Sequence, residues 1–285
     1  MADHPTSAGV AFVLGGGGIL GAHEVGMLRA LAERELVPDI VLGTSIGAVN
    51  GALFAADPSA EGVERLTDLW VHSNLAEVSA GGLLRRAGTL ARTGTHVQSL
   101  REARARLAEA LPVERVEELR LPFQCVAASI ERAAEHWFDT GILVDVVLAS
   151  CAVPGVLPPV RIGDEHFIDG GIVNSIPVAR AVALGAHTIY VLQVGRVETP
   201  LSPPRWPWEV GLVAFEVARR HRFAHDLTAL PDGVELHVMP TGGSAAPAYN
   251  DIGAQLRYRR IARTVQTQIA SAYEASRRYL DGGGD

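Results

Sequence analysis

The chain has 285 residues, of which 48% are hydrophobic and 20% charged, a composition typical of a globular protein. All 25 basic residues are arginines against 32 acidic residues, which gives a net charge of −7. The absence of lysine excludes a Schiff-base lysine, a phosphate-loop lysine and a serine–lysine dyad. The acidic balance argues against nucleic acid as the main partner. Two cysteines, Cys125 and Cys151, are too few for a four-cysteine metal site or a disulfide framework.

The sequence predicts no membrane-spanning helix and no secretory signal. The first basic residue is Arg29, so the N-terminal segment lacks the basic start of a signal. The most apolar long stretch, residues 141–160, contains an aspartate and three prolines. We expect a cytoplasmic protein that would meet a membrane only from its surface. The cysteine count also fits another compartment in which the chain needs no disulfides.

Short apolar runs alternate with helical patterns along the whole chain. This alternation predicts an α/β fold, in which a central, mostly parallel sheet carries helices on both faces. No convincing linker divides the chain, so residues 1–285 are expected to form a single domain. In chain order the expected elements are a strand at 9–14, helices at 21–36, 48–56 and 63–70 with a strand at 40–42 among them, a helix at 100–111, strands at 121–130 and 135–138, helices at 142–149 and 177–184, a strand at 188–194, a helix at 210–229, a strand at 234–239 and a helix at 252–280.

Two segments lack such periodicity. Residues 73–98 gather Gly, Ser, Thr and Arg and are predicted to form a mobile connection or a lid. Residues 196–208 are rich in Pro and Trp and are predicted to be a linker.

The pentapeptide Gly43-Thr44-Ser45-Ile46-Gly47 matches G-x-S-x-G and lies between a predicted strand and a predicted helix. This is the context of a nucleophile elbow, in which glycines permit a strained turn that lifts the serine hydroxyl out of the sheet. The helix N-terminus behind it favours developing negative charge. The alternative is a glycine-rich turn with an incidental serine, and the flanking strand and helix favour the nucleophile.

A second motif, residues 16–21 (GGGILG), also follows a strand and precedes a helix. It matches the dinucleotide fingerprint G-x-G-x-x-G, with Asp39 downstream as the candidate ribose ligand. It equally fits an oxyanion hole, in which free backbone N–H groups converge on a tetrahedral intermediate. In a dinucleotide fold the acidic residue ends the second strand, whereas Asp39 starts it and Ser45 follows its end. We therefore favour the oxyanion hole.

The third motif is Asp169-Gly170-Gly171, after the apolar pair Phe167-Ile168. A carboxylate at a strand end, flanked by glycines, can approach another backbone closely. If it lies within hydrogen-bond reach of Ser45, it can accept the hydroxyl proton directly. A turn aspartate that only caps the two glycines is the alternative.

Together these motifs resemble the patatin-like phospholipase family, which carries a glycine-rich oxyanion motif, a G-x-S-x-G and a D-G-G or D-G-A in the same order. The proline-containing segment 149–160 and residues 170–178 and 184–186 are also similar to the family's sequences. The likeness covers residues 9–200, and the C-terminal helical part, 209–280, carries little of it.

The resemblance implies a three-layer α/β sandwich and a Ser–Asp dyad, with Ser45 as nucleophile and Asp169 as general base. It implies hydrolysis of carboxylic esters of phospholipids or other acyl lipids through an acyl-enzyme, without a metal or a cofactor. The family often has a basic residue where this chain has Leu20, which puts any role of that cation in doubt. The implied oxyanion amides are those of Gly16, Gly17, Gly18 and Ile46, and the motif glycines are Gly21, Gly43, Gly47, Gly170 and Gly171.

Two other functions remain open at this stage: a catalytically silent, lipid-binding or regulatory relative, and an oxidoreductase that binds a dinucleotide at residues 16–21. A Ser–Asp–His triad is also an alternative, because His187 and His237 follow the motifs in chain order. Both lie in or beside apolar strands, where a packed histidine is the simpler interpretation. The pair His23-Glu24 is expected to be solvated or to line the pocket entrance, and His225-Asp226 is expected to be a surface pair.

Several surface features are compatible with lipid contact. Trp206-Pro207-Trp208 places two large aromatic residues on a loop, which would sit at a membrane boundary or pack over the core. The last helix carries six arginines that would attract anionic lipid or form an ordinary solvated face. Cys125 and Cys151 are expected to be small buried apolar residues. The six arginines are Arg257, Arg259, Arg260, Arg263, Arg277 and Arg278.

Overall fold

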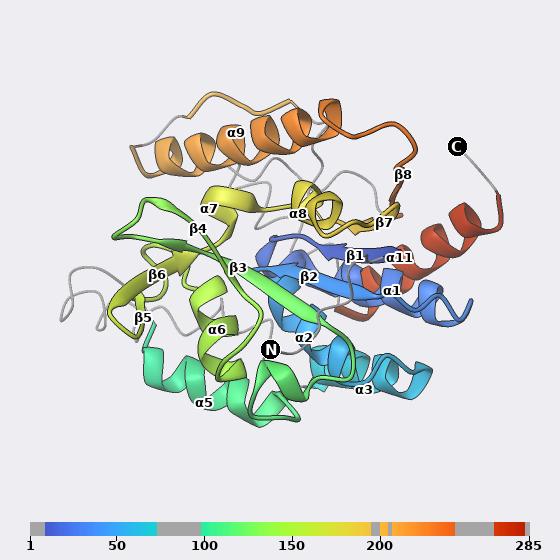
Figure 1. The fold of residues 1–285 in the computed structure, drawn as a ribbon, viewed down its shortest axis with the longest axis horizontal. Coiled ribbons are helices and arrows are strands. Elements are labelled where there is room, and N and C mark those ends of the chain that lie inside the picture. The colour runs from blue at the N-terminus through green and yellow to red at the C-terminus, as the bar shows by residue number, and fades with distance from the viewer. Residues whose placement is uncertain (1–8, 73–97, 195–199, 205–206, 243–264, 283–285) are drawn as a thin grey trace.

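The computed structural model describes residues 9–72, 98–194, 200–204, 207–242 and 265–282. Its elements are arranged as one central sheet between two layers of helices (Figure 1). The strands are β1 (Val10–Leu14), β2 (Ile40–Thr44), β3 (Phe123–Ser129), β4 (Ala134–Phe138), β5 (Val160–Ile162), β6 (Glu165–Asp169), β7 (Thr188–Leu192) and β8 (Glu235–Val238). The helices are η1 (Gly18–Gly21), α1 (Ala22–Ala32), α2 (Ile46–Ala56), α3 (Ala60–His72), α5 (Leu100–Ala110), η3 (Val116–Glu118), α6 (Leu143–Ser150), α7 (Gly171–Asn174), α8 (Val178–Ala183), α9 (Pro207–Thr228) and α11 (Val265–Leu280).

The sheet has the strand order β5-β6-β3-β2-β1-β7-β8, and β4 pairs with β3 outside this path. The pairs from β3 through β2, β1 and β7 to β8 are all parallel. The expectation of an α/β fold with a mostly parallel sheet is therefore confirmed. The other part of the sheet is antiparallel, since β4 and β6 run against β3 and β5 runs against β6.

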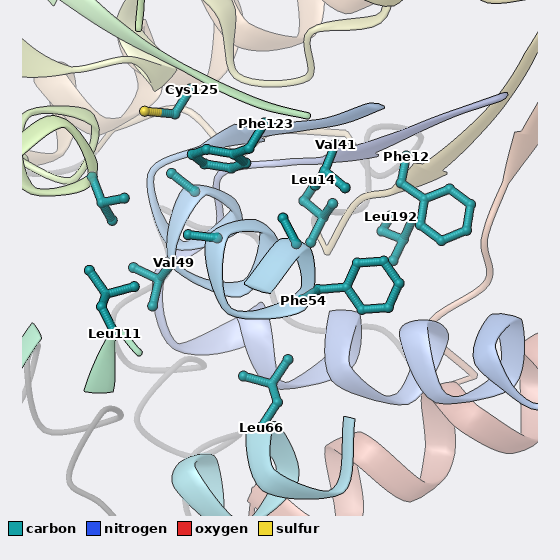
Figure 2. Close-up of a cluster of buried hydrophobic side chains, with 14 of the residues drawn as sticks. Phe12, Leu14, Val41, Val49, Phe54, Leu66, Leu111, Phe123, Cys125 and Leu192 are labelled. Atoms are coloured by element: carbon teal, nitrogen blue, oxygen red, sulfur yellow. The ribbon is translucent and has the colours of Figure 1, made fainter. Parts of the chain in front are cut away.

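Alternate residues of β1 serve the two faces of the sheet, as the two-residue period of a strand requires. Phe12 and Leu14 join the larger core, which packs against α2. Figure 2 shows their side chains with those of Phe54 and Phe123 around this helix. Ala11, with its neighbours on the opposite face, joins a smaller core that α8 and α9 cover. Because both faces are buried, the central strands read as continuous apolar runs.

Most expected elements are present with small changes at their ends. The strand β5 and the short helix α7 were not predicted. The expected helix 252–280 is described only as α11, from Val265 onward. The expected lid, the aromatic side chains at 206 and 208, and the arginines at 257–263 lie outside the described residues. No helix in the described ranges is long and apolar enough to cross a bilayer.

Candidate active site

Ser45 forms a sharp turn between β2 and α2. Its backbone has φ 55° and ψ −123°, a conformation that L-residues rarely adopt. The turn is tight because a Cβ on Gly43 would lie 2.6 Å from the Cα of Ala48. A Cβ on Gly47 would lie 2.3 Å from the carbonyl oxygen of Leu14. The two glycines thus let α2 start immediately after the strand, which is the geometry of a nucleophile elbow.

Strand pairing explains why Ser45 and Asp169 meet although 124 positions separate them. One edge of β3 pairs with β4, and the other edge pairs first with β2 and then with β6. Thr44, the last residue of β2, pairs with Val126, whereas Asp169, the last residue of β6, pairs with Ala127. The carboxyl ends of β2 and β6 therefore face each other along the same edge of β3, and Ser45 lies at this junction.

The two side chains at the junction are hydrogen-bonded. Ser45 Oγ donates to Asp169 Oδ2 at 2.6 Å, and the N–H of Gly171 donates to Asp169 Oδ1 at 2.7 Å. Ser45 is 8% exposed and Asp169 is 3% exposed. Burial raises the pKa of Asp169 to about 6, against the opposing effect of the hydrogen bonds from Ser45 and Gly171. At neutral pH this carboxylate is mostly ionised and has a higher proton affinity than an exposed aspartate.

The end of α6 fixes the backbone of the elbow. The N–H of Ser45 donates to Ser150 Oγ at 2.9 Å, and this hydroxyl donates in turn to the carbonyl of Val126 at 2.7 Å. The thiol of Cys151 donates to the carbonyl of Ser45 at 3.0 Å. Cys125 is fully buried as expected, but Cys151 is a contact of the elbow and not a simple core residue. No feature of the sequence singled out Ser150, although it lies in the proline-containing segment similar to the family.

The glycine loop lies directly beside Ser45. A Cβ on Gly16 would lie 3.5 Å from the Cβ of Ser45. However, the N–H of Gly16 donates to the carbonyl of Ser175 at 3.0 Å, so this amide is engaged and does not fit the expected oxyanion role. Among the described residues, the N–H groups of Gly17 and Gly18 have no hydrogen-bond acceptor. Ile46 starts α2, so its N–H has no partner within the helix.

The remaining motif glycines are positions at which chain segments approach closely. A Cβ on Gly21 would lie 2.5 Å from the side chain of Ile46, and one on Gly170 would lie 2.1 Å from the carbonyl of Val126. A Cβ on Gly171 would lie 2.9 Å from Asp169 Oδ1. A side chain at Gly171 would thus displace the carboxylate itself.

Below the glycine loop is a buried polar chain that sequence reasoning missed. Glu24 is fully buried, and its Oε2 accepts a hydrogen bond from Asn50 Nδ2 at 2.7 Å. The same nitrogen donates to the carbonyl of Gly21 at 3.0 Å, and Trp70 Nε1 donates to Asn50 Oδ1 at 2.8 Å. Burial raises the pKa of Glu24 well above its ordinary value, against the opposing effect of the hydrogen bond from Asn50.

The expectation of a solvated His23-Glu24 pair was wrong. His23 is also buried, its Nδ1 is 3.0 Å from the carbonyl of Leu20, and burial lowers its pKa. The cause is the position of α1, whose first turn lies under the glycine loop. Leu20, which stands where the family often has a cation, is partly buried in η1.

The other candidate side chains lie away from the dyad. The backbone N–H of His187 donates to the carbonyl of Gly9, at the end of the sheet where β1 begins. His237 on β8 stacks on Tyr190 and contacts Tyr279 OH at 3.1 Å, and two strands separate β8 from β2. These positions contradict the triad. Asp39 Oδ2 accepts a hydrogen bond from the N–H of Val10, where β1 begins and at the end of the sheet opposite to Ser45. This position contradicts a role of Asp39 as a ribose ligand.

Comparison with known proteins finds a matching family model, similar curated proteins and a solved structure of low similarity. The family model for patatin-like phospholipase matches residues 12–182. Patatin-like phospholipase domain-containing protein 7 of Rattus norvegicus is 34% identical over 200 residues, which are 69% of this chain and 14% of that protein. Lysophospholipase nte1 of Emericella nidulans is 30% identical over 189 residues, 66% of this chain and 12% of that protein. The crystal structure of VipD from Legionella pneumophila is 14% identical with a TM-score of 0.46, and the match covers 98% of this chain and 67% of that chain. The chain thus spans about an eighth of the length of the two curated relatives.

Proposed function

The chain belongs to the patatin-like phospholipase family, and on this premise we propose that it is a serine lipid acyl hydrolase. It cleaves carboxylic ester bonds of phospholipids or other acyl lipids, with Ser45 as nucleophile and Asp169 as general base. The observation that carries the proposal is the hydrogen bond of 2.6 Å from Ser45 Oγ to Asp169 Oδ2. A nucleophile and a base within direct hydrogen-bond reach are the minimum for acyl transfer.

The reaction proceeds in two steps. In the first, Ser45 Oγ attacks the ester carbonyl while its proton passes to Asp169 Oδ2, and the alcohol leaves with a proton to give an acyl-enzyme. In the second, water gives a proton to the same carboxylate and attacks the acyl carbonyl, and Asp169 passes this proton to Ser45 Oγ as the fatty acid leaves. A pKa of about 6 suits Asp169 to both roles, because the group is ionised at neutral pH yet binds a proton more readily than an exposed aspartate.

The tetrahedral intermediate carries a negative oxygen that needs hydrogen-bond donors. We assign this role to the N–H groups of Gly17 and Gly18, with that of Ile46 in addition. The first two belong to the loop beside the nucleophile, and Ile46 is the first residue of α2. The N-terminal end of α2 adds the positive end of its dipole. Gly16, whose amide is engaged with Ser175, is left out of this set.

The substrate class follows from the family and from the curated relative named a lysophospholipase. We propose that the enzyme acts in the cytoplasm at the surface of a membrane or lipid aggregate. The two cysteines are free thiols, as is usual in a reducing compartment. Val153 and Ile172 are exposed apolar residues, each next in the chain to a residue that is hydrogen-bonded to Asp169, and they are suited to contact acyl chains.

The test combines active-site labelling with a lipid panel. A fluorophosphonate should label the wild-type protein at Ser45, and released fatty acid should appear with phospholipid, lysophospholipid or neutral acyl-lipid vesicles. The variants Ser45→Ala and Asp169→Asn should lose both signals, whereas His237→Ala should retain both. A folded wild-type protein that neither labels nor releases fatty acid would show the catalytically silent relative instead.

A further inference from the structure

Ser175, between α7 and α8, carries an unusual hydroxyl. The residue is 3% exposed, and its carbonyl accepts the N–H of Gly16 at 3.0 Å. Its Oγ is fully buried and has no hydrogen-bond partner among the described residues. Buried hydroxyl groups nearly always have a partner, because an unsatisfied one has lost its hydration without compensation. The structure gives no internal reason for this hydroxyl to be here.

The hydroxyl adjoins the nucleophile. A methyl group placed on Gly16 would lie 3.2 Å from Ser175 Oγ and 3.5 Å from the Cβ of Ser45. Both serines therefore border the same point of the glycine loop. A second orphan lies close by, since Gln193 Oε1 is buried without a partner and a methyl group on Gly15 would lie 3.6 Å from the Cβ of Gln193. Two buried polar atoms beside Gly15 and Gly16 thus have no partner among the described residues.

We propose that Ser175 is a catalytic residue whose hydroxyl donates a hydrogen bond to the carbonyl oxygen of the substrate as that oxygen becomes negative. The inference rests on the proposed function and specifies its oxyanion site. Ser175 also explains why the oxyanion site needs a hydroxyl donor. The carbonyl of Ser175 occupies the amide of Gly16, and its hydroxyl supplies a replacement donor beside the same glycine.

The chemistry favours this use of a free hydroxyl. A serine O–H rotates about its C–O bond, and without an internal acceptor it can turn its proton towards the substrate. The bond becomes charge-assisted only when the tetrahedral intermediate forms, so it strengthens from the ground state to the transition state. It therefore accelerates the chemical step more than it tightens substrate binding.

The experiment compares Ser175→Ala with a matched control, Ser276→Ala. Ser276 is also fully buried, but its hydroxyl donates to the carbonyl of Pro240 and it lies on α11. The measured quantities are kcat and KM on a short acyl ester, the inhibition constant of a trifluoromethyl ketone that forms an oxyanion with Ser45, and the unfolding temperature.

We expect Ser175→Ala to lower kcat about 100-fold with little change in KM, the size of effect that follows loss of one oxyanion donor. The ketone should bind more weakly by a similar factor. The unfolding temperature should not fall, because the lost hydroxyl has no internal bond. Ser276→Ala should show the reverse pattern, with normal turnover and a lower unfolding temperature.

Three results would overturn the inference. If Ser175→Ala turns over like the wild type while Asp169→Asn is inactive, the proposed function stands and the role of Ser175 falls. If Ser175→Ala unfolds at a lower temperature and the ketone binds normally, the hydroxyl is structural. If the wild-type protein neither labels with a fluorophosphonate nor hydrolyses any ester, both proposals fall together.

Discussion

The dyad at the junction of β2 and β6 and the polar chain under the glycine loop each contain one buried carboxyl group. Asp169 and Glu24 are both almost completely buried. Both oxygens of Asp169 accept a hydrogen bond, one from Ser45 and one from Gly171. Glu24 Oε2 accepts a hydrogen bond from Asn50, and the backbone N–H of Gly15 also faces this carboxyl group, although Oε1 has no partner of good geometry among the described residues. Burial raises the pKa of both groups, but that of Asp169 only to about 6.

The difference shows that burial alone does not make a general base. Burial disfavours the charged form in both places and hydrogen-bond donors oppose it in both, but only Asp169 is bonded to a nucleophile, Ser45 Oγ. Asp169 changes its charge close to neutral pH, where proton transfer is useful. Glu24 bonds to Asn50 and not to the nucleophile, so it serves to position Asn50 and the end of the glycine loop at Gly21.

Amide substitutions at the two carboxyl groups should therefore have opposite results. Asp169→Asn removes the proton acceptor of Ser45, and we expect hydrolysis to fall by about three orders of magnitude or more. Glu24→Gln keeps a side chain of the same shape whose oxygen can still accept the hydrogen bond from Asn50, so turnover should stay close to the wild type. Initial rates on a short acyl ester measure both effects. A large loss in Glu24→Gln would show that hydrolysis requires the Glu24 carboxyl itself.

The pH dependence should also separate the two regions. Because Asp169 must be ionised to accept a proton, kcat/KM should rise with pH to a plateau, with a midpoint at about pH 6. Because Glu24→Gln leaves the bond between Ser45 and Asp169 in place, its profile should superimpose on that of the wild type. A wild-type profile that is flat across pH 6 would contradict the assignment of Asp169 as base.

The same pKa has a consequence for stability. The pKa of Asp169 in the folded protein, about 6, exceeds its ordinary value of 3.8, so the folded state binds the proton more tightly. The free energy of unfolding should therefore fall as the pH rises from about 4 to about 6, by about 3 kcal/mol, and change little from this source above that range. Asp169→Asn should remove this dependence. Urea titrations of both proteins at several pH values measure the difference.

In the buried polar chain of Glu24, Asn50 and Trp70, we expect Trp70→Phe to reduce stability and to leave the dyad in place. The change leaves Asn50 Oδ1 buried without its donor, which costs about 1–3 kcal/mol of unfolding free energy. Trp137→Phe is the control, because Trp137 is half-buried on β4 and its ring forms a cation–π pair with the guanidinium of Arg180. Urea denaturation compares the two. Equal losses would show that the polar chain adds nothing to the packing of Trp70.

The parallel part of the sheet could be predicted because its strands are buried on both faces and read as apolar runs, as in residues 10–14 and 188–192. The antiparallel part was harder. Its strand β5 has three residues and follows a proline-rich segment, too short for any periodicity. Which edge of β3 receives β6 depends on long-range pairing that the order of residues does not reveal.

Some residues of the candidate site could likewise be predicted from the sequence, and others could not. Ser45 and Asp169 could be predicted because motif glycines mark the turns that hold them. Ser150 and Ser175 could not, because their importance lies in hydrogen bonds to residues more than 100 positions away. Glu24 was misjudged because a charged residue in the first turn of a helix is usually solvated, whereas here it is buried and bonded to Asn50 of α2.

The smallest effect that we expect concerns the strain at Ser45. Its φ of 55° is unfavourable for any residue with a Cβ, at a cost of about 1–3 kcal/mol, and glycine adopts such angles freely. Ser45→Gly and Ser45→Ala both lose the hydroxyl and should both be inactive, but the glycine variant should be more stable by about 1 kcal/mol. Ala133→Gly, at φ 48° in the turn between β3 and β4, is the control for the same strain away from the dyad. Urea denaturation compares the two variants: if Ser45→Ala proves the more stable one, the backbone at Ser45 is not strained.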